Sequence, residues 1–187
     1  QPITNNLHRL GKCYNIRNNF QGGTVMINAQ QISQKLQEQG IPFRTISHLA
    51  VFTAEQADRY VREENFVRTK NLFLTTNKHN HYYLVLIEEH KRLDTKRFRQ
   101  LIGTPRLTFA SPAELQEKLG LTPGSVSPFG LLNNRDHDVQ LFVDRDVATA
   151  ATIGCHPNDN TMTTILATGD LLRFLRQAGF SVQVIGR

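Results

Sequence analysis

One loop combines residue types that expose backbone N–H groups with two hydroxyl side chains. Residues 122–131, Thr-Pro-Gly-Ser-Val-Ser-Pro-Phe-Gly-Leu, include two prolines and two glycines. Proline fixes its φ and lacks an N–H, whereas glycine lacks the Cβ that would keep a ligand away from the backbone. The segments 123–124 and 128–130 can therefore bracket a small concave site that contains Ser125 and Ser127. A tight structural turn accounts for the same residues.

A lysine and a histidine stand out in two other segments. Lys70 interrupts an apolar, strand-like segment and would share a face with Leu72 and Leu74, so it either protects a sheet edge or points into a polar cavity. His156 lies in the turn 154–161, Gly-Cys-His-Pro-Asn-Asp-Asn-Thr. This composition suits a site better than a core, although a histidine in a turn can be incidental.

Basic residues are concentrated in the middle of the chain. Within the sixteen residues 91–106 only Asp94 opposes Lys91, Arg92, Lys96, Arg97, Arg99 and Arg106. The segment forms either a solvated helix face or a surface that follows phosphates. The net charge of +6 and the pI near 9.6 favour a polyanionic partner.

Other catalytic chemistry is poorly supported. Cys155 and His156 are adjacent and would point apart in an extended chain, which disfavours a thiol nucleophile. His79 and His81 lack a carboxylate or cysteine at metal-ligand spacing, so a solvated turn is the simpler interpretation. We find no Ser-His-Asp spacing, no nucleophile elbow and no metal signature, and we expect neither a metal nor a cofactor.

The elements that must position these residues are a hairpin surrounded by capped helices. Capping patterns and stop signals predict helices at 28–39, 53–64, 94–101, 111–119 and 170–178, and alternation predicts strands at 42–48, 66–75, 81–88, 106–110, 139–143, 162–167 and 180–185. Hairpin pairing predicts an α+β fold whose mixed, largely antiparallel sheet has helices packed outside it.

Length and composition favour one domain. The 187 residues, 39% of them hydrophobic, can bury one core, which we expect in residues 26–187 after an N-terminal extension at 1–25. No apolar run approaches the roughly 18 residues that span a bilayer. Two distant cysteines give no disulfide framework, so we expect a reduced, cytoplasmic location without membrane contact.

Five ordered blocks resemble the YbaK-like family, which is related to the editing domain of bacterial prolyl-tRNA synthetase. They are 70–74 (Lys-Asn-Leu-Phe-Leu), 83–87 (Tyr-Leu-Val-Leu-Ile), 106–111 (Arg-Leu-Thr-Phe-Ala-Ser), 123–131 (Pro-Gly-Ser-Val-Ser-Pro-Phe-Gly-Leu) and 156–161 (His-Pro-Asn-Asp-Asn-Thr). The resemblance extends from about Ile27 to Val184 and implies a barrel-like mixed sheet. The two last blocks resemble the freestanding branch that removes alanine from mischarged proline tRNA more than the branch that removes cysteine.

The resemblance also implies roles for individual residues. Lys70 would hold the terminal phosphate or ribose, Asn71 would orient the ester, the backbone around 124–130 would line the amino-acid pocket, and Gly154 with His156 would form the opposite wall. The expected catalytic residues are Lys70, Asn71, Gly124, Ser125 and His156. The expected substrate-binding residues are His48, Ser127, Pro128, Phe129, Gly130, Gly154, Pro157 and Asn158. The expected tRNA-binding residues are Lys91, Arg92, Lys96, Arg97 and Arg99.

The implied function is trans-editing hydrolysis of mischarged tRNA(Pro), with Ala-tRNA(Pro) as the expected substrate and the ribose 2′-OH activating the water. A pocket that fits a methyl group can exclude the proline ring by steric clash. Cys-tRNA(Pro) or a Ser- or Thr-tRNA remains an alternative substrate. A non-catalytic module that binds the tRNA or prolyl-tRNA synthetase is the rival class. The expected partners are the tRNA(Pro) acceptor end and the synthetase.

Overall fold

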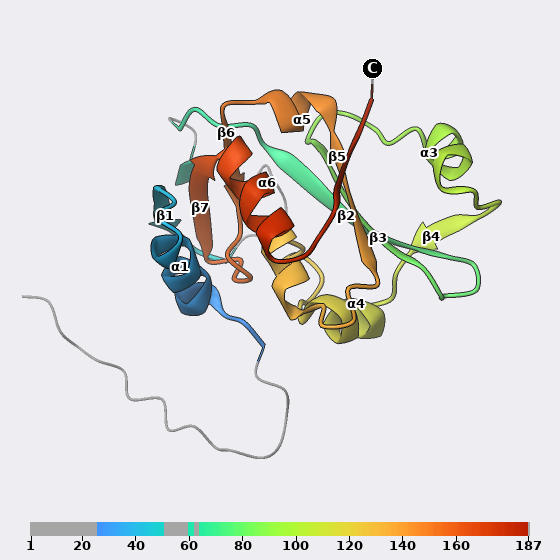
Figure 1. Ribbon diagram of the computed structural model, residues 1–187, viewed down its shortest axis with the longest axis horizontal. Coiled ribbons are helices and arrows are strands. Elements are labelled where there is room, and N and C mark those ends of the chain that lie inside the picture. Colours follow the sequence, from blue (N-terminus) through green and yellow to red (C-terminus); the bar gives the residue numbers. More distant parts are fainter. Residues whose placement is uncertain (1–25, 51–59, 62–63, 187) are drawn as a thin grey trace, which may run out of the picture.

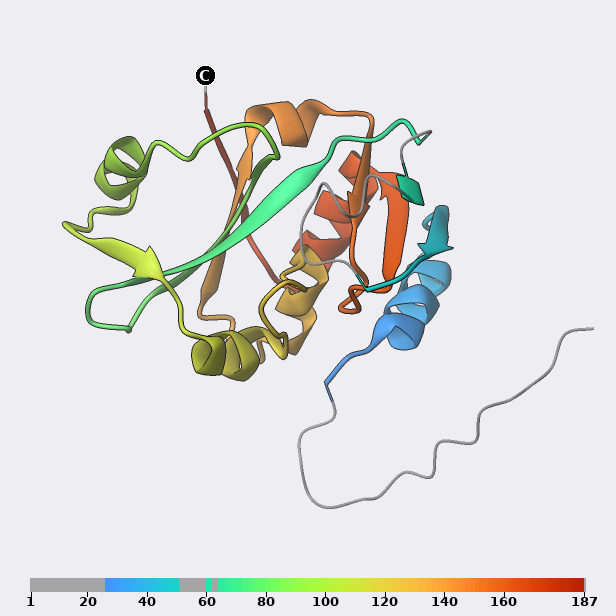
Figure 2. The ribbon, with the colours of Figure 1, turned by 180° about the vertical axis from the view of Figure 1, so that it is seen from behind.

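The computed structural model describes residues 26–50, 60–61 and 64–186, which form two β-sheets and the helices around them (Figures 1 and 2). The extension expected at 1–25 and most of the helix expected at 53–64 lie outside these residues. No helix of the described part has both the length and the apolar character needed to cross a membrane.

The smaller sheet is antiparallel and has the order β1-β7-β6. Its strands are β1 (Phe43–Ser47), β6 (Thr152–Cys155) and β7 (Met162–Ala167). Strands β6 and β7 form a hairpin, and the turn between them contains His156. The sequence did not predict β6, because its four residues run directly into the glycine- and proline-containing turn.

The larger sheet is mixed and has the order β4-β2-β3-β5-β8. Its strands are β2 (Thr69–Thr76), β3 (Tyr82–Glu88), β4 (Leu107–Phe109), β5 (Val139–Asp144) and β8 (Val182–Ile185). Pairing is antiparallel for β2–β3 and β2–β4 but parallel for β3–β5 and β5–β8. Helical connections precede β5 and β8, as parallel neighbours require.

The mixed α/β character and the outer helices confirm the predicted fold class, but the strands of the described residues do not close into a barrel. A parallel bridge between Val67 and Ile153 joins the two sheets at their margins, where the Val67 N–H donates to the Thr152 carbonyl at 2.8 Å. Because this bridge is isolated, each sheet stays open. It nevertheless brings the start of β2 alongside β6.

Three predicted helices begin at their capping residues, whereas the last helix begins at Thr168, two residues before the predicted Asp170, and lacks a side-chain cap. They are α1 (Ala29–Glu38), α3 (Thr95–Ile102), α4 (Pro112–Leu119), α5 (Arg145–Thr149), α6 (Thr168–Gln177) and the 3₁₀ helix η1 (Pro128–Asn133). Asn28 and Ser111 form complete capping boxes, Asp94 caps α3, and Gly120 ends α4 with a left-handed φ of 65°. The sequence did not predict α5 and η1, which are short.

Two apolar clusters lie on opposite faces of the larger sheet. One contains Phe73 and Leu84 and packs against α1, α4, η1 and α6. The other contains Leu74 and Tyr83 and packs against Phe98 of α3. Because side chains alternate along β2, Lys70 and Asn71 belong to opposite faces of this sheet.

Candidate functional site

The first half of the loop is a tight β-turn. The Ser125 N–H donates to the Thr122 carbonyl at 3.0 Å, and Gly124 has a φ of 88°, which only glycine adopts without strain. Proline followed by a left-handed glycine is the pattern of a type II turn. The buried Ser125 hydroxyl donates to the Thr122 carbonyl at 2.8 Å and accepts from the Thr122 N–H at 3.2 Å. Ser125 therefore fixes the turn.

The second half of the loop enters the core as η1. Pro128, Phe129 and Gly130 are all buried. The Phe129 ring packs edge-on against Phe174 with 6.2 Å between centroids, and a Cβ on Gly130 would approach Leu121 Cδ1 to 2.6 Å. These three residues, expected from the sequence to bind substrate, thus form a packed base beneath the turn.

Ser127 connects the loop to the β6–β7 turn. Its buried hydroxyl donates to the His156 carbonyl at 2.5 Å and accepts from the Phe129 N–H at 3.2 Å, so it also caps η1. On the other side, Asn71 Nδ2 donates to the carbonyl of Val126 at 2.8 Å. Two consecutive loop residues are therefore bonded to β2 and to the β6–β7 turn. The structure brings Asn71, the loop and His156 together at the junction of the two sheets.

His156 is held as a neutral imidazole. Its Nδ1 lies 2.9 Å from the Met162 carbonyl, which can only accept, so we assign the proton to Nδ1 and leave Nε2 with a lone pair. Burial lowers the pKa of His156, and the hydrogen bond to Met162 only partly offsets this effect. Near neutral pH the histidine therefore supplies an acceptor at Nε2.

His48 stands beside His156, with ring centroids 6.2 Å apart. Its Nδ1 donates to the Leu49 carbonyl at 2.8 Å, and its Nε2 lies 3.0 Å from the Thr163 hydroxyl. The ring also stacks on Tyr60 at 5.4 Å. Both ring nitrogens are engaged, so His48 forms a fixed wall next to His156.

The remaining residues of the β6–β7 turn shape its backbone. A Cβ on Gly154 would lie 2.4 Å from the Phe66 ring, and Pro157 is buried. Asn158 has a left-handed φ of 60°, and its Nδ2 donates to the Ile27 carbonyl at 3.0 Å. Burial raises the pKa of Cys155 to about 12, so this thiol is unsuited to nucleophilic attack.

Lys70 lies at the start of β2 but on the face opposite Asn71. Its strand partner across the hairpin is Ile87, and its Nζ donates to the carbonyl of Glu89, two residues further along the chain, at 2.8 Å. The sequence predicted that Lys70 would share a face with Leu72 and Leu74, and both residues do pack in the cluster under α3. The lysine is half-buried and bonded to backbone at the sheet margin.

The basic segment is divided between internal bonds and exposed groups. Lys91 Nζ lies 2.7 Å from Asp144 and 2.5 Å from Asp146, and hydrogen bonds to these carboxylates raise the pKa of Lys91. Arg99 donates to the carbonyls of Thr95 and Pro105 at 3.2 and 2.8 Å. Arg92, Lys96 and Arg97 are exposed.

Among the described residues, one group of three side chains has ligand atoms close enough together to hold a metal ion. Ligand atoms of Glu88, Glu89 and His90 lie within 4.8 Å of one another at the end of β3. They are consecutive in sequence, and the His90 ring forms an ion-pair contact with Glu89 at 3.1 Å. His79, considered as a ligand from the sequence, instead contacts Glu114 at 2.7 Å.

Several site contacts had no signal in the sequence. The carbonyls of Val126 and Met162 are backbone groups, and their partners depend on how the two sheets meet. Thr163 orients His48 although it lies 115 residues away. The one sequence signal that could have indicated this contact is the position of Thr163 in the strand directly after the polar turn.

One protein family matches the part of the chain that contains all five sequence blocks. Residues 48–174 match the model of the aminoacyl-tRNA editing domain. The chain therefore belongs to the aminoacyl-tRNA editing domain family.

Two relatives extend the similarity. The chain is 35% identical over 156 residues to the "Prolyl-tRNA editing protein ProX" of Acetoanaerobium sticklandii, covering 83% of this chain and 95% of that protein. It is 31% identical to the "Prolyl-tRNA synthetase associated domain-containing protein 1" of Danio rerio, covering 79% and 81%. A crystal structure of a candidate trans-editing enzyme for prolyl-tRNA synthetase aligns with a TM-score of 0.66 at 22% identity, over 88% and 99% of the two chains, and supports the fold.

Proposed function

We propose that the protein is a trans-editing deacylase that hydrolyses mischarged tRNA(Pro), with Ala-tRNA(Pro) as its preferred substrate. Membership of the editing-domain family and similarity to a prolyl-tRNA editing protein over 95% of that protein support this proposal. The structural observation that carries it is the bonding of the 122–131 loop to both Asn71 and His156. This arrangement holds three of the resembling blocks in one place.

The chemistry is hydrolysis of an ester. The water oxygen bonds to the aminoacyl carbonyl carbon, the bond from that carbon to the ribose oxygen breaks, and the ribose oxygen takes a proton to give free amino acid and tRNA. Since the ester is already activated, a placed water and donors for the developing oxyanion suffice. We propose that the ribose 2′-OH activates the water and that no metal takes part.

The loop amides are the proposed oxyanion donors. Within the loop, the N–H groups of Ser125, Phe129 and Gly130 are bonded to neighbouring loop oxygens. We therefore assign the oxyanion contact to the N–H groups that remain in this part of the loop, those of Gly124, Val126 and Ser127. Ser125 acts as a positioning residue because its hydroxyl holds the turn.

His156 and His48 form the proposed opposite wall. The unprotonated Nε2 of His156 accepts a hydrogen bond from the substrate or its attacking water. Gly154, Pro157 and Asn158 fix the backbone that presents this ring, with Gly154 admitting the Phe66 side chain. Pro128, Phe129 and Gly130 support the floor.

Lys70 and the exposed cations are proposed to hold the tRNA. Lys70 would exchange its bond to the Glu89 carbonyl for the terminal phosphate or ribose, which gains a charge-assisted contact. Arg92, Lys96 and Arg97 are placed to meet the phosphate backbone, whereas Lys91 and Arg99 shape the surface through their internal bonds.

Substrate preference would follow from pocket size. Exclusion of the proline ring by clash protects correctly charged tRNA(Pro). Cysteinyl, seryl and threonyl esters differ from alanyl ester by groups worth only about 1–3 kcal/mol in such a pocket, so they are the competing substrates within this proposal. A non-catalytic module for tRNA or prolyl-tRNA synthetase is the competing class.

The testing experiment is a deacylation panel with the purified chain and alanyl, cysteinyl, seryl, threonyl and prolyl esters of tRNA(Pro). The proposal requires release of alanine faster than the other amino acids and survival of the prolyl ester. Faster release of cysteine would reassign the substrate, and hydrolysis of none would favour the binding module.

We further propose that residues 26–187 are the editing domain and 1–25 an extension, that the protein acts in the cytoplasm, and that prolyl-tRNA synthetase is a partner.

A further inference from the structure

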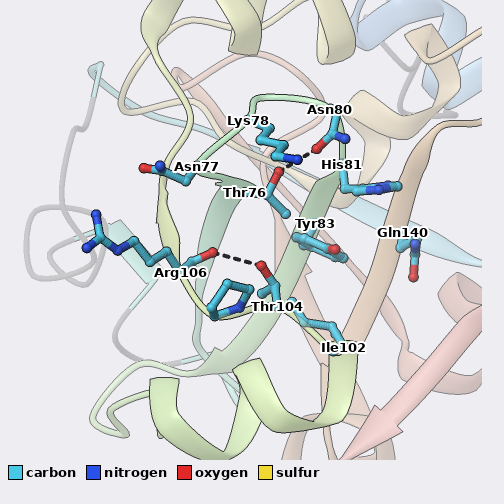
Figure 3. Close-up of a pocket in the computed structure, with 12 residues that line it drawn as sticks. Thr76, Asn77, Lys78, Asn80, His81, Tyr83, Ile102, Thr104, Arg106 and Gln140 are labelled. Carbon is cyan, nitrogen blue, oxygen red and sulfur yellow. Dashed lines mark hydrogen bonds between the residues drawn. The ribbon is translucent and has the colours of Figure 1, made fainter.

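A polar cavity lies at the opposite end of the β2–β3 hairpin from Lys70. It has a volume of about 520 Å³ and opens between the β2–β3 turn and the connection from α3 to β4 (Figure 3). Three basic side chains, Lys78, His81 and Arg106, line it together with Tyr83 and Ile102, and the rest of its lining consists mainly of hydroxyl and amide side chains. Figure 3 shows Arg106 on one side of the cavity and His81 on the other. No Asp or Glu is among its lining residues.

This lining defines the kind of ligand. The volume falls in the range of about 300–1,000 Å³ that is usual for small-molecule sites. Cations and neutral donors without a carboxylate favour an anion, and phosphate is an anion that lysine and arginine commonly bind. Ile102 and the edge of the largely buried Tyr83 ring give the lining an apolar part that suits a base or sugar. Together these features fit a phosphate-bearing nucleotide.

The position of the cavity connects it to the candidate site. Thr76, at the cavity, and Lys70 share one face of β2, and the six-residue separation corresponds to about 20 Å at the rise of a strand. Between them on β4 lies Phe109, which is paired with Leu74 and 67% exposed. Exposed aromatic rings beside cations are typical of surfaces that bind nucleic-acid strands. One sheet face therefore carries a lysine, an exposed ring and a basic cavity in a row.

We propose that this cavity binds a nucleotide of the tRNA backbone about 20 Å along β2 from Lys70, and that Lys78 and Arg106 contact its phosphate. The identity of the nucleic acid rests on the proposed function, whereas the phosphate chemistry rests on the cavity itself. The contact anchors the tRNA body and does not take part in hydrolysis.

The test measures binding of uncharged tRNA(Pro) by fluorescence anisotropy, so it does not depend on hydrolysis. The full chain is compared with the double variant Lys78→Ala/Arg106→Ala between about 50 and 200 mM salt. We expect the Kd to rise about ten-fold at the lower salt and the slope of log K against log salt to fall by about 2, one for each lost phosphate contact. The matched control is Lys35→Ala/Arg176→Ala, which removes the same charge from exposed positions on α1 and α6.

The outcomes separate this inference from the proposed function. A Kd and salt slope equal to those of the control variant would overturn the nucleotide site even if the chain deacylates Ala-tRNA(Pro) normally. The expected losses would support it even if the chain hydrolyses no ester. Titration with 5′-AMP distinguishes the source of the phosphate. If the full chain binds AMP, the double variant does not, and both bind tRNA with the same affinity, the ligand of the cavity is a free nucleotide and the tRNA assignment is overturned.

Discussion

The Ser127 hydroxyl donates a hydrogen bond to the carbonyl of His156, 29 residues further along the chain. This contact joins the proline- and glycine-rich loop to the turn between β6 and β7. The carbonyl of the neighbouring residue, Val126, accepts a hydrogen bond from Asn71. Two consecutive loop residues therefore fix the position of the loop relative to β2 and to the β6–β7 turn. The backbone of the loop and the ring of His156 are thereby held as one unit.

Replacement of this hydroxyl should therefore affect function more than stability. For Ser127→Ala we expect kcat/KM for Ala-tRNA(Pro) to fall about 10- to 100-fold, because the loop amides and His156 lose their fixed spacing. Unfolding free energy should fall by about 1–3 kcal/mol, since the carbonyl of the half-buried His156 loses its donor. Deacylation kinetics and denaturant unfolding measure the two effects.

Ser33→Ala provides the matched control for Ser127. The Ser33 hydroxyl also donates to a carbonyl, that of Ala29, but within α1. It should leave kcat/KM unchanged. An equal loss of activity in both variants would show that the link to His156 has no special role.

Lys70 provides the test of charge at the start of β2. We expect Lys70→Ala to lose activity by at least about 100-fold, because the positive charge at the site is lost. The fold should stay intact with a modest drop in Tm, because the hydrogen bond from Lys70 to the Glu89 carbonyl contributes about 1.5–3 kcal/mol. Lys70→Arg should retain part of the activity. A collapsed thermal transition for Lys70→Ala would instead assign the lysine to the stability of the sheet margin.

The pH dependence of hydrolysis should reflect His156. Burial lowers its pKa below the ordinary value of about 6.5, so the ring stays neutral at pH 7 and protonates only at lower pH. We expect kcat/KM to be constant around neutrality and to fall as pH decreases through this lowered pKa. The same group makes folding less favourable below about pH 6.5, where the unfolded chain binds the proton first. If kcat/KM of the His156→Asn variant still falls at low pH in the same way, His156 is not the group that causes the fall.

Glu114 should govern acid stability away from the site. Burial opposes its ionisation, but hydrogen bonds from Ser111, His79 and Tyr82 outweigh burial and lower its pKa to about 2. Since the folded pKa lies below the unfolded value near 4.5, this stabilisation is complete above about pH 4.5 and is lost as pH falls towards 2. Glu114→Gln should lower Tm at pH 7 and flatten its acid limb. Parallel Tm–pH curves for the two proteins would contradict this assignment.

Local signals predicted most of the elements but not how the two sheets meet. Asn28, Asp94 and Ser111 cap the helices that their patterns indicated, because capping depends on residues three or four apart. The barrel-like closure was not found, since closure depends on strand pairings such as Val67 with Ile153 that no local pattern encodes.

The sequence likewise predicted some parts of the candidate site and not others. The loop and the His156 turn were recognisable from proline, glycine and polar residues, and the structure does bring them together. The sequence suggested that Phe129 contacts substrate, but its ring packs in the core, because a buried aromatic and a pocket aromatic have the same residue type. Alternation also predicted that Lys70 shares a face with Leu72 and Leu74, which leaves Asn71 on the other face, and the structure agrees.

The most direct test of the central claim is the rate at which the purified chain deacylates Ala-tRNA(Pro) beside Pro-tRNA(Pro), with Ser127→Ala measured in parallel. The account predicts rapid release of alanine, a prolyl ester that decays no faster than in buffer, and a large loss of alanine release in the variant. Equal hydrolysis of both esters, or none above buffer, would contradict it.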